Sequence, residues 1–336
     1  MSKMEDLKLE EILYNDKYII IDVRSQGEYE EDHIPGAINL PILSDEERAE
    51  VGTVYKNVSQ EKAKALGLRY SGPKLEEYYE KVLEFRMNHK EVCFYCFRGG
   101  MRSHSIAKVM ELLGERVHVL EGGYKTYRSY VIEELGKFSD YSFNVIHGYT
   151  GSGKTVLLNR YKGNGRNVID LEGLAKNRGS VFGDIGIDEK ISQKKFDSLL
   201  LKELKLNRGA AIFVESESKR IGSVLIPDHV FEKMQEGRHF FLKTKMEDRI
   251  KIIRDDYLRD TNEKVLSEIR GKIEKLKKQL GNEKLDELLN KFDEANYDYV
   301  IEKLMVDYYD PWYEKSIVNY TFEKYIKFEE EMGLTR

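Results

Sequence analysis

Short apolar runs alternate with stretches of helical spacing along the first half of the chain. The runs that predict buried strands are Tyr18–Val23, Glu91–Cys96 and Val117–Leu120. The stretches that predict helices are Ser44–Leu68, Leu75–Asn88 and Arg102–Leu113, the last of which ends before Gly114 as a natural cap. Between them, His33–Pro41 predicts a loop with a short strand. This alternation implies a parallel sheet with helices on both faces.

A second set of elements begins near Phe143. Its predicted strands are Phe143–Ile146, Asn167–Leu171, Ala210–Glu215 and His239–Leu242. After Met246 the chain becomes helical and highly charged, and one apolar stripe favours a helix packed on its own domain over a short coiled coil. The members of this stripe are Leu266, Ile269, Ile273, Leu276 and Leu280. The change of pattern near Lys137–Tyr141 predicts two α/β domains, 1–137 and 138–336, the second with a helical C-terminal part.

Composition narrows the class of protein. The 336 residues are 40% hydrophobic and 34% charged, and no apolar run approaches the roughly 20 residues that a membrane helix needs. The two cysteines exclude a disulfide framework, and the first residues lack the apolar stretch of a signal peptide, so we expect a reducing cytoplasm and no membrane partner. The net charge of -5 argues against an overall basic footprint for nucleic acid, although local basic patches can still bind it.

The first candidate site is the loop that begins at Cys96. It follows a predicted strand and precedes a predicted helix, where backbone N–H groups and the helix dipole favour an anion. Gly99 and Gly100 let the backbone curl around a ligand, and Arg98 and Arg102 add positive charge. These features should lower the pKa of the Cys96 thiol and make it a nucleophile.

Two further interpretations concern the cysteines. The loop fits C-x5-R, the pattern of cysteine-dependent phosphatases, in which Cys96 would attack phosphorus and Arg102 would clamp the phosphoryl oxygens. This alternative stays open. Cys93 lies within the strand and is interpreted as a core residue.

The second candidate site matches G-x4-G-K-[ST] in full, between a strand and a helix. Its phosphate-binding residues are Gly148, Thr150, Gly151, Ser152, Gly153, Lys154 and Thr155. Backbone N–H groups would cradle phosphates, Lys154 would reach the terminal ones, and Thr155 could bind Mg²⁺. Such a cradle accepts any diphosphate, so ATP is a candidate ligand and not a certain one.

The spacing of residues along the sequence does not decide which acidic residue accompanies the phosphate loop. An apolar strand that ends in an acid helps to position the metal in many phosphate-loop enzymes. The run Ala210–Glu215 fits this description, with Glu215 and Glu217 as candidates. Asp170, at the end of another predicted strand, is a second candidate.

Several motifs of the first domain resemble the rhodanese family. Asp22–Arg24, Glu28–Tyr29 and the HIPGAINLP run look like its first signature, and Val117–Tyr127 is similar to its closing one. The resemblance implies that Cys96 is the chalcogen-accepting cysteine. Asp22, Arg24 and His33 are interpreted as residues that fix the fold.

The whole chain resembles the bacterial tRNA 2-selenouridine synthases, which join a rhodanese-like domain to a phosphate-loop domain. The motifs that carry this resemblance are CFRGGMRS, GYTGSGKT, EVGTVYK and YYDPWY. It implies conversion of wobble 2-thiouridine in tRNA to 2-selenouridine, with selenophosphate as the selenium donor. It also implies an S-geranylated intermediate made from geranyl diphosphate, no tightly bound cofactor, and an upstream enzyme that supplies selenophosphate.

Other functions are retained beside this one. A sulfurtransferase or phosphatase coupled to a nucleotide-dependent kinase is the alternative enzyme, and a non-catalytic sensor of nucleotide and oxidation state is the third class. Acidic residues are interleaved with the basic residues after Lys243, so we interpret this region as a solvated face rather than a binding surface for tRNA. The aromatic YYDPWY run is interpreted as core rather than as a base-stacking surface, and Arg98 and Arg178 are candidate tRNA contacts.

Overall fold

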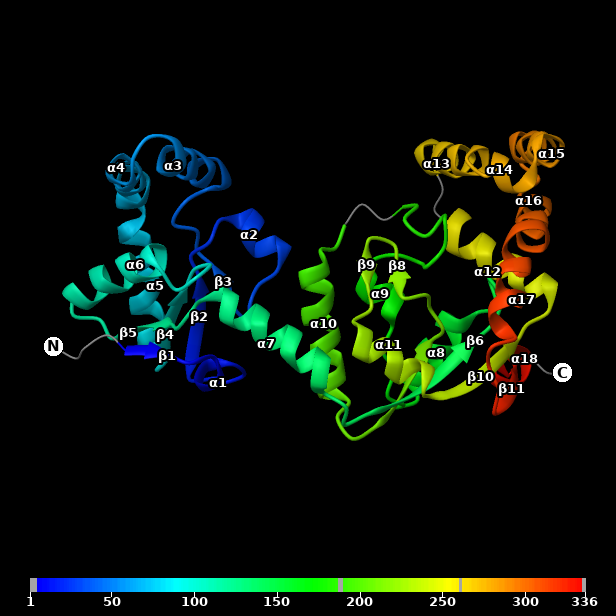
Figure 1. Ribbon diagram of the computed structural model, residues 1–336, viewed down its shortest axis with the longest axis horizontal. Helices are drawn as coiled ribbons and strands as arrows, with labels where there is room; N and C mark the ends of the chain where they lie inside the picture. Colours follow the sequence, from blue (N-terminus) through cyan, green and yellow to red (C-terminus); the bar gives the residue numbers. More distant parts are fainter. Residues whose placement is uncertain (1–4, 187–189, 260–261, 334–336) are drawn as a thin grey trace. The chain divides into compact units, whose positions relative to one another are not determined.

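The computed structural model describes residues 5–186, 190–259 and 262–333 (Figure 1). The chain divides into two units, Met1–Glu134 and Leu135–Arg336. The division falls slightly before the expected boundary at residue 137, inside helix α7 (Tyr124–Lys137). Helix α7 therefore carries the chain out of the first unit and ends at Lys137, and the residues that follow it, 138–141, are not helical.

The first unit is built on a five-stranded sheet in which every pairing is parallel. The strand order is β1-β5-β4-β2-β3, so the strand that leads into the cysteine loop lies in the middle. The strands are β1 (Glu5–Leu7), β2 (Tyr18–Asp22), β3 (Ile38–Asn39), β4 (Glu91–Tyr95) and β5 (Val117–Leu120). The predicted parallel sheet is confirmed, and the short edge strand within His33–Pro41 is β3.

Helices connect these strands. They are α1 (Leu9–Ile12), α2 (Gln26–Glu31), α3 (Asp45–Asn57), α4 (Gln60–Ser71), the 3₁₀ turn η1 (Gly72–Lys74), α5 (Leu75–Met87) and α6 (Met101–Leu112). The predicted helical stretch Ser44–Leu68 is interrupted at Val58 and Ser59. The Ser59 hydroxyl accepts a hydrogen bond from Lys62 N–H at 3.1 Å, and such a cap starts a new helix.

A buried ion pair orders the carboxyl end of β2. The Arg24 guanidinium lies 2.6 Å from the Asp22 carboxylate, and both side chains are shielded from solvent. Arg24 also donates to the Asp32 carbonyl at 2.8 Å. His33 stacks on Tyr29 at 3.8 Å between ring centroids. These contacts support the structural role predicted for Asp22, Arg24 and His33.

The second unit contains a four-stranded parallel sheet, in the order β11-β10-β6-β7, and a small antiparallel ribbon. The strands are β6 (Ser142–His147), β7 (Ala211–Glu215), β10 (Arg238–Lys243) and β11 (Lys324–Lys327), with β8 (Arg220–Ile221) and β9 (Val224–Leu225) in the ribbon. The strand predicted at Asn167–Leu171 is wrong. Only Val168 bridges to β7, because Asp170 caps a helix that begins at Leu171.

Helices surround this sheet and extend into a helical C-terminal part. They are α8 (Lys154–Gly163), α9 (Leu171–Ala175), α10 (Gln193–Leu206), α11 (Asp228–Gln235), α12 (Met246–Leu258), α13 (Glu263–Glu274), α14 (Lys277–Leu280), α15 (Asn282–Asp293), α16 (Tyr297–Leu304), the π-helix η2 (Met305–Tyr309), α17 (Asp310–Ile317) and α18 (Phe328–Met332).

The predicted apolar stripe packs inside this helical part. Ile269, Ile273 and Leu276 are buried in one cluster with Leu285 and Phe292 of α15. The expectation of a helix packed on its own domain is confirmed. The stripe is divided between α13 and α14, which are separated at Lys275 and Leu276.

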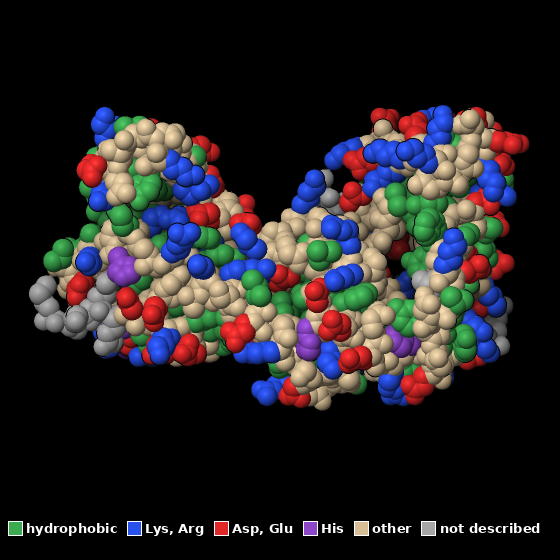
Figure 2. Space-filling model, viewed as in Figure 1, with side chains coloured by type: hydrophobic (Ala, Val, Ile, Leu, Met, Phe, Trp, Pro, Cys, Tyr) green, Lys and Arg blue, Asp and Glu red, His purple; other side chains and the backbone are tan. Residues whose placement is uncertain are grey.

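The surface bears charges of both signs. Lys and Arg side chains are interleaved with Asp and Glu over the visible face of each unit (Figure 2). This arrangement agrees with the solvated-face interpretation of the charged runs. Among the described residues, no helix is both long enough and apolar enough to cross a membrane.

Candidate functional site

The thiol of Cys96 lies directly after β4, where the chain turns into α6. Its Sγ accepts a hydrogen bond from Gly100 N–H at 3.2 Å and another from the Ser103 hydroxyl at 3.3 Å. The N-terminus of α6 adds positive potential at the same place. The loop therefore presents donors toward sulfur, as the sequence predicts for an anion-binding turn.

These donors favour the thiolate. Burial of Cys96 acts to raise the pKa of its thiol, but the hydrogen bonds from Ser103 and Gly100 and the charge of Arg102 outweigh it, so the pKa is lowered. Burial instead raises the pKa of Cys93 strongly, and this side chain is fully enclosed. The surroundings of the two cysteines thus differ: they favour the thiolate at Cys96 and the neutral thiol at Cys93.

The two arginines of the loop have different surroundings. Arg102 donates to both oxygens of Glu28, at 2.7 and 3.3 Å, so much of its charge is balanced within the protein. Arg98 is exposed beside the Phe97 ring. Attack of this thiolate on phosphorus, as in a phosphatase of the C-x5-R type, would use the arginine to clamp the phosphoryl oxygens. Arg102 would have to release Glu28 to serve in that way.

Two glycines allow the backbone around the cysteine loop to pack closely. Gly99 and Gly123 have positive φ values of 59° and 62°. A Cβ on Gly123 would lie 2.2 Å from the Cys96 carbonyl oxygen, and one on Gly99 would lie 2.8 Å from the Leu120 carbonyl oxygen. In addition, Tyr124 N–H donates to the Cys96 carbonyl at 2.9 Å. The closing rhodanese-like motif therefore shapes the cysteine loop through backbone contact.

Gly123→Ala should destabilise the first unit by about 3 kcal/mol, because both the contact and the backbone conformation oppose a side chain there. The control is Gly52→Ala, since Gly52 lies within α3 and a Cβ there meets no atom within 4 Å. It should stabilise by about 0.5 kcal/mol. Chemical denaturation measures both changes, and equal effects would contradict the tight packing beneath the loop.

The phosphate loop joins β6 to α8. Gly151 and Gly153 have φ values of 72° and 82°, which residues that carry a side chain rarely adopt. A Cβ on Gly148 would lie 2.4 Å from the Ser152 hydroxyl, and one on Gly153 would lie 2.6 Å from the Phe328 ring. The glycine spacing of the motif is therefore required by close packing as well as by the turn itself.

An ion pair that the sequence analysis did not find holds this loop. Arg249 of α12 donates to the Thr150 carbonyl at 2.9 Å and forms two bonds, at 2.6 and 3.0 Å, with Asp310. Asp310 belongs to the YYDPWY run. The position of an acid within an aromatic run could have drawn attention to Asp310. Its basic partner, Arg249, lies 61 residues away in sequence.

The same aromatic run has both buried and exposed members. Tyr309 packs against the apolar cluster of the helical part, whereas Trp312 is 63% exposed. Tyr313 faces the phosphate loop, with its ring centroid 5.8 Å from the Lys154 ammonium. The core interpretation therefore holds for Tyr309 and not for Trp312.

Lys154 lies within the cradle and points back toward its first residue. Its ammonium nitrogen is 3.4 Å from the Gly148 carbonyl oxygen. Burial acts to lower the pKa of Lys154, but Tyr313 and nearby glutamates raise it, and the net direction is upward. The cradle therefore holds a charged ammonium ready to face an anion.

Three carboxylates meet beside this lysine. Oxygens of Glu172, Glu215 and Glu217 all lie within 4.8 Å of one another. The Thr155 hydroxyl donates to Glu215 at 3.3 Å, because β7 runs parallel to β6 and ends at the same sheet edge. Burial raises the pKa of all three carboxyls, and their mutual repulsion raises it further. Carboxylates and a hydroxyl in this arrangement could hold a divalent cation.

The structure distinguishes Glu215 from Asp170 among the predicted acids. Glu215 contacts Thr155, whereas the Asp170 carboxylate accepts Gly173 N–H at 2.7 Å as the cap of α9. Glu172 was not predicted. The helix that begins just after Asp170 brings it to the cluster, and that turn was interpreted as a strand.

A cleft of about 770 Å³ surrounds the cradle. Its wall includes all phosphate-loop residues from Thr150 to Thr155, together with Asp170, Glu172, Glu215 and Arg178. Arg178 lies 5.0 Å from the Tyr257 ring centroid. Figure 2 shows a hollow in the face of this unit, with hydrophobic side chains gathered along one rim. The cleft can take an extended polyanion with room beyond it.

Family models match both parts of the chain. The rhodanese-like domain matches residues 6–130, and the tRNA 2-selenouridine synthase AAA domain matches residues 141–331. These matches confirm the predicted fold class, a rhodanese-like domain followed by a phosphate-loop α/β domain with helices at its C-terminal side.

Curated relatives match along most of their length. A tRNA 2-selenouridine synthase of Nitrosomonas europaea is 32% identical, and the match covers 88% of each chain. One of Marinobacter nauticus is 33% identical, covering 88% of this chain and 87% of the relative. A solved N-terminal domain of a putative ATP/GTP binding protein from Clostridium difficile is 46% identical over 38% of this chain and 98% of its own, with a TM-score of 0.37.

Proposed function

Because the chain belongs to the tRNA 2-selenouridine synthase family, we propose that it converts wobble 2-thiouridine in tRNA to 2-selenouridine in two steps. In the first, geranyl diphosphate alkylates the thiocarbonyl sulfur. In the second, selenium derived from selenophosphate replaces the alkylated sulfur. The observation that carries this proposal is the pair of anion-binding loops, one with a thiol whose pKa is lowered and one with a part-buried lysine.

The phosphate loop serves the first step. The bond between C1 of geranyl diphosphate and its bridging oxygen breaks, a bond from the thiouridine sulfur to C1 forms, and pyrophosphate leaves. Lys154 and the backbone N–H groups of the cradle balance the growing charge on pyrophosphate. A divalent cation fits Thr155, Glu215 and Glu217, where it would add charge neutralisation. The step uses no ATP.

The cysteine loop serves the second step. Selenium in selenophosphate already has the charge of selenide, so forming a sulfur–selenium bond at Cys96 would require an oxidant. A balanced route is attack of the Cys96 thiolate on phosphorus, which forms an S–P bond and releases hydrogen selenide anion. The selenide then attacks C2 of the alkylated uridine, and geranyl thiol leaves with the transferred proton. Water then breaks the S–P bond, which restores the Cys96 thiol and releases inorganic phosphate.

Nucleoside mass spectrometry of tRNA tests the proposal. Purified protein, 2-thiouridine tRNA, geranyl diphosphate, Mg²⁺ and selenophosphate should yield first the geranylated and then the selenated nucleoside. Adding ATP should change nothing. A product formed only with ATP, or no modified nucleoside under any condition, would overturn the two-step scheme.

The proposed chemistry also leads to expectations about an upstream enzyme, the cellular compartment and a contact with tRNA. Selenophosphate is a reactive donor, so we place an enzyme that makes it directly upstream. Thiolate chemistry at Cys96 requires a reducing compartment, and we propose the cytoplasm for this reason. Arg98, exposed at the mouth of the cysteine loop, is our candidate for a contact with the tRNA backbone.

Glu217→Gln tests the cation site. Without Mg²⁺ the melting temperature should rise by about 2–4 °C, because one member of a crowded buried acid cluster becomes neutral. The increase that Mg²⁺ itself produces should shrink. Glu232→Gln, at an exposed position of α11, should leave both values unchanged. An undiminished Mg²⁺ effect in the Glu217 variant would exclude this carboxylate as a ligand.

A further inference from the structure

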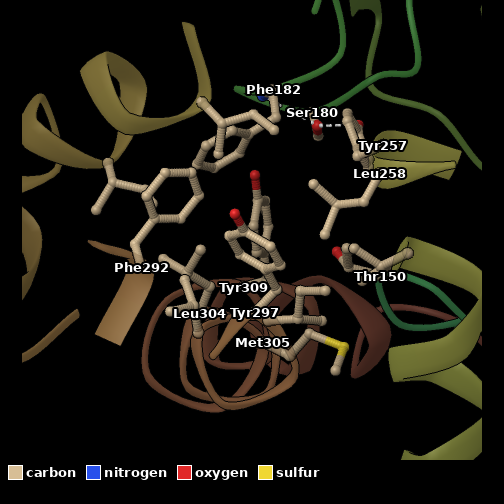
Figure 3. A pocket seen from close by; sticks show the side chains of 15 residues that line it. Thr150, Ser180, Phe182, Tyr257, Leu258, Phe292, Tyr297, Leu304, Met305 and Tyr309 are labelled. Atoms are coloured by element: carbon tan, nitrogen blue, oxygen red, sulfur yellow. Dashed lines mark hydrogen bonds between the residues drawn. The ribbon is translucent and has the colours of Figure 1, made fainter. Parts of the chain in front are cut away.

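A second cavity adjoins the phosphate cleft and has a different character. The centre of a sphere of the size of water can occupy about 80 Å³ of this cavity. Its wall is built from α12, α13, α15, α16 and the π-helix η2, with Ser180 and Phe182 from the loop after α9 (Figure 3). None of the described residues that line it has a charged side chain. The cavity therefore excludes a polyanion and favours an apolar group.

The cavity and the cleft share part of their walls. Thr150, Ser180, Ile253 and Tyr257 line both of them. Thr150 is a phosphate-loop residue, so the apolar space begins beside the cradle. A ligand whose anionic head lies on the cradle can place its remaining part in the cavity without crossing exposed protein.

The polar groups at the entrance do not suit a nucleobase. The Ser180 and Tyr257 hydroxyls lie 3.3 Å apart and are hydrogen bonded to each other. Further in, the hydroxyls of Tyr297 and Tyr309 point into the space (Figure 3), and most of the remaining wall is apolar, with side chains such as Ile269, Leu304 and Phe292. A base buried there would lose its hydrogen bonds to water and gain few in return.

Part of this wall has an unusual backbone. Met305–Tyr309 forms a π-helix, a conformation that is frequent at functional sites because it redirects side chains. Met305 and Tyr309 both line the cavity. The cavity would therefore have a different shape if this turn were a regular α-helix.

We propose that the cavity holds the hydrocarbon chain of an alkyl diphosphate while its diphosphate lies on the phosphate loop. This inference rests on the proposed function, which requires such a substrate. By volume the cavity accepts roughly five to eight groups of the size of water or methylene. It therefore suits the distal part of a chain of about ten carbons, with the reacting C1 in the cleft beside Lys154.

Two side chains set the accepted length. Phe292 lies across the cavity from Thr150 in Figure 3, so its ring limits how far the chain can extend. Val300 of α16 is buried and lines the cavity. Phe292→Ala should lengthen the space, and Val300→Phe should shorten it.

The test measures affinities of the full chain, with Mg²⁺, for inorganic pyrophosphate and for dimethylallyl, geranyl and farnesyl diphosphates. Wild-type protein should bind geranyl diphosphate at least tenfold more tightly than pyrophosphate. Phe292→Ala should shift the preference to the farnesyl chain, and Val300→Phe should shift it to the dimethylallyl chain, each by tenfold or more. Leu288→Ala, buried in the same cluster and not lining the cavity, should keep the geranyl preference.

The outcomes separate the cavity from the reaction. Length preferences that both variants leave unchanged would overturn the cavity proposal, even if wild-type protein geranylates tRNA. The predicted shifts without any transfer to tRNA would support the cavity and overturn the proposed function. Thermal melting identifies folded variants, and the opposite direction of the Val300→Phe shift cannot arise from loss of stability.

Discussion

Replacing Cys96 by serine should abolish formation of 2-selenouridine, with a loss of at least a hundredfold, while geranylation of tRNA continues. Serine has a similar size, but its hydroxyl stays protonated, so the donors from Gly100 and Ser103 have no anion to stabilise. Mass spectrometry of digested tRNA after incubation with selenophosphate measures both products. The geranylated nucleoside should accumulate.

The matched control is Cys93→Ala, three residues earlier and within strand β4. Cys93 is buried in the core, and burial raises the pKa of its thiol strongly, so it should contribute no thiolate. Selenation per folded molecule should stay within about twofold of wild type, with a stability loss of about 1 kcal/mol. Full selenation by Cys96→Ser, or equal losses in both variants, would refute the assignment of the nucleophile.

Lys154→Ala should reduce geranylation by roughly 10²- to 10³-fold, because it removes the one cation placed within the cradle. The pyrophosphate that leaves would then lack a buried positive partner while three glutamates remain nearby. Transfer of a radiolabelled geranyl group to tRNA measures the rate. Lys162→Ala, exposed on the same helix, should leave the rate unchanged.

A second substrate separates the two loops. If tRNA is supplied already geranylated, Lys154→Ala should selenate it at a nearly normal rate, whereas Cys96→Ser should not. This pattern follows because the lysine serves the diphosphate and the thiolate serves the selenium donor. Equal impairment of both variants with the pre-geranylated tRNA would mean that the loops do not divide the steps as proposed.

The two loops could be predicted from sequence because each is continuous along the chain. Glycine positions such as Gly99 and Gly153 indicate where the backbone must curl, and the structure shows both with positive φ and close neighbours. Parallel strands also followed from short apolar runs between helices. Local signals therefore located the donors of both anion sites.

What the sequence could not show depends on distant contacts. Glu172 joins Glu215 only through the fold, and the run before it was interpreted as a strand although Asp170 starts a helix there. The contact of Arg249 with Asp310 joins segments far apart along the chain. The apolar cavity likewise arises from side chains of several helices that no single stretch of sequence brings together.

The support of the phosphate loop by later segments has a consequence for the order of events during synthesis. The motif leaves the ribosome long before Asp310, which fixes Arg249 beneath Thr150, and before Phe328, which packs on Gly153. Strand β11, which completes the sheet edge, is also made late. A nascent chain therefore carries the complete motif without its final shape, and it stays a poor competitor for the cell's abundant diphosphates until the tail has folded onto it.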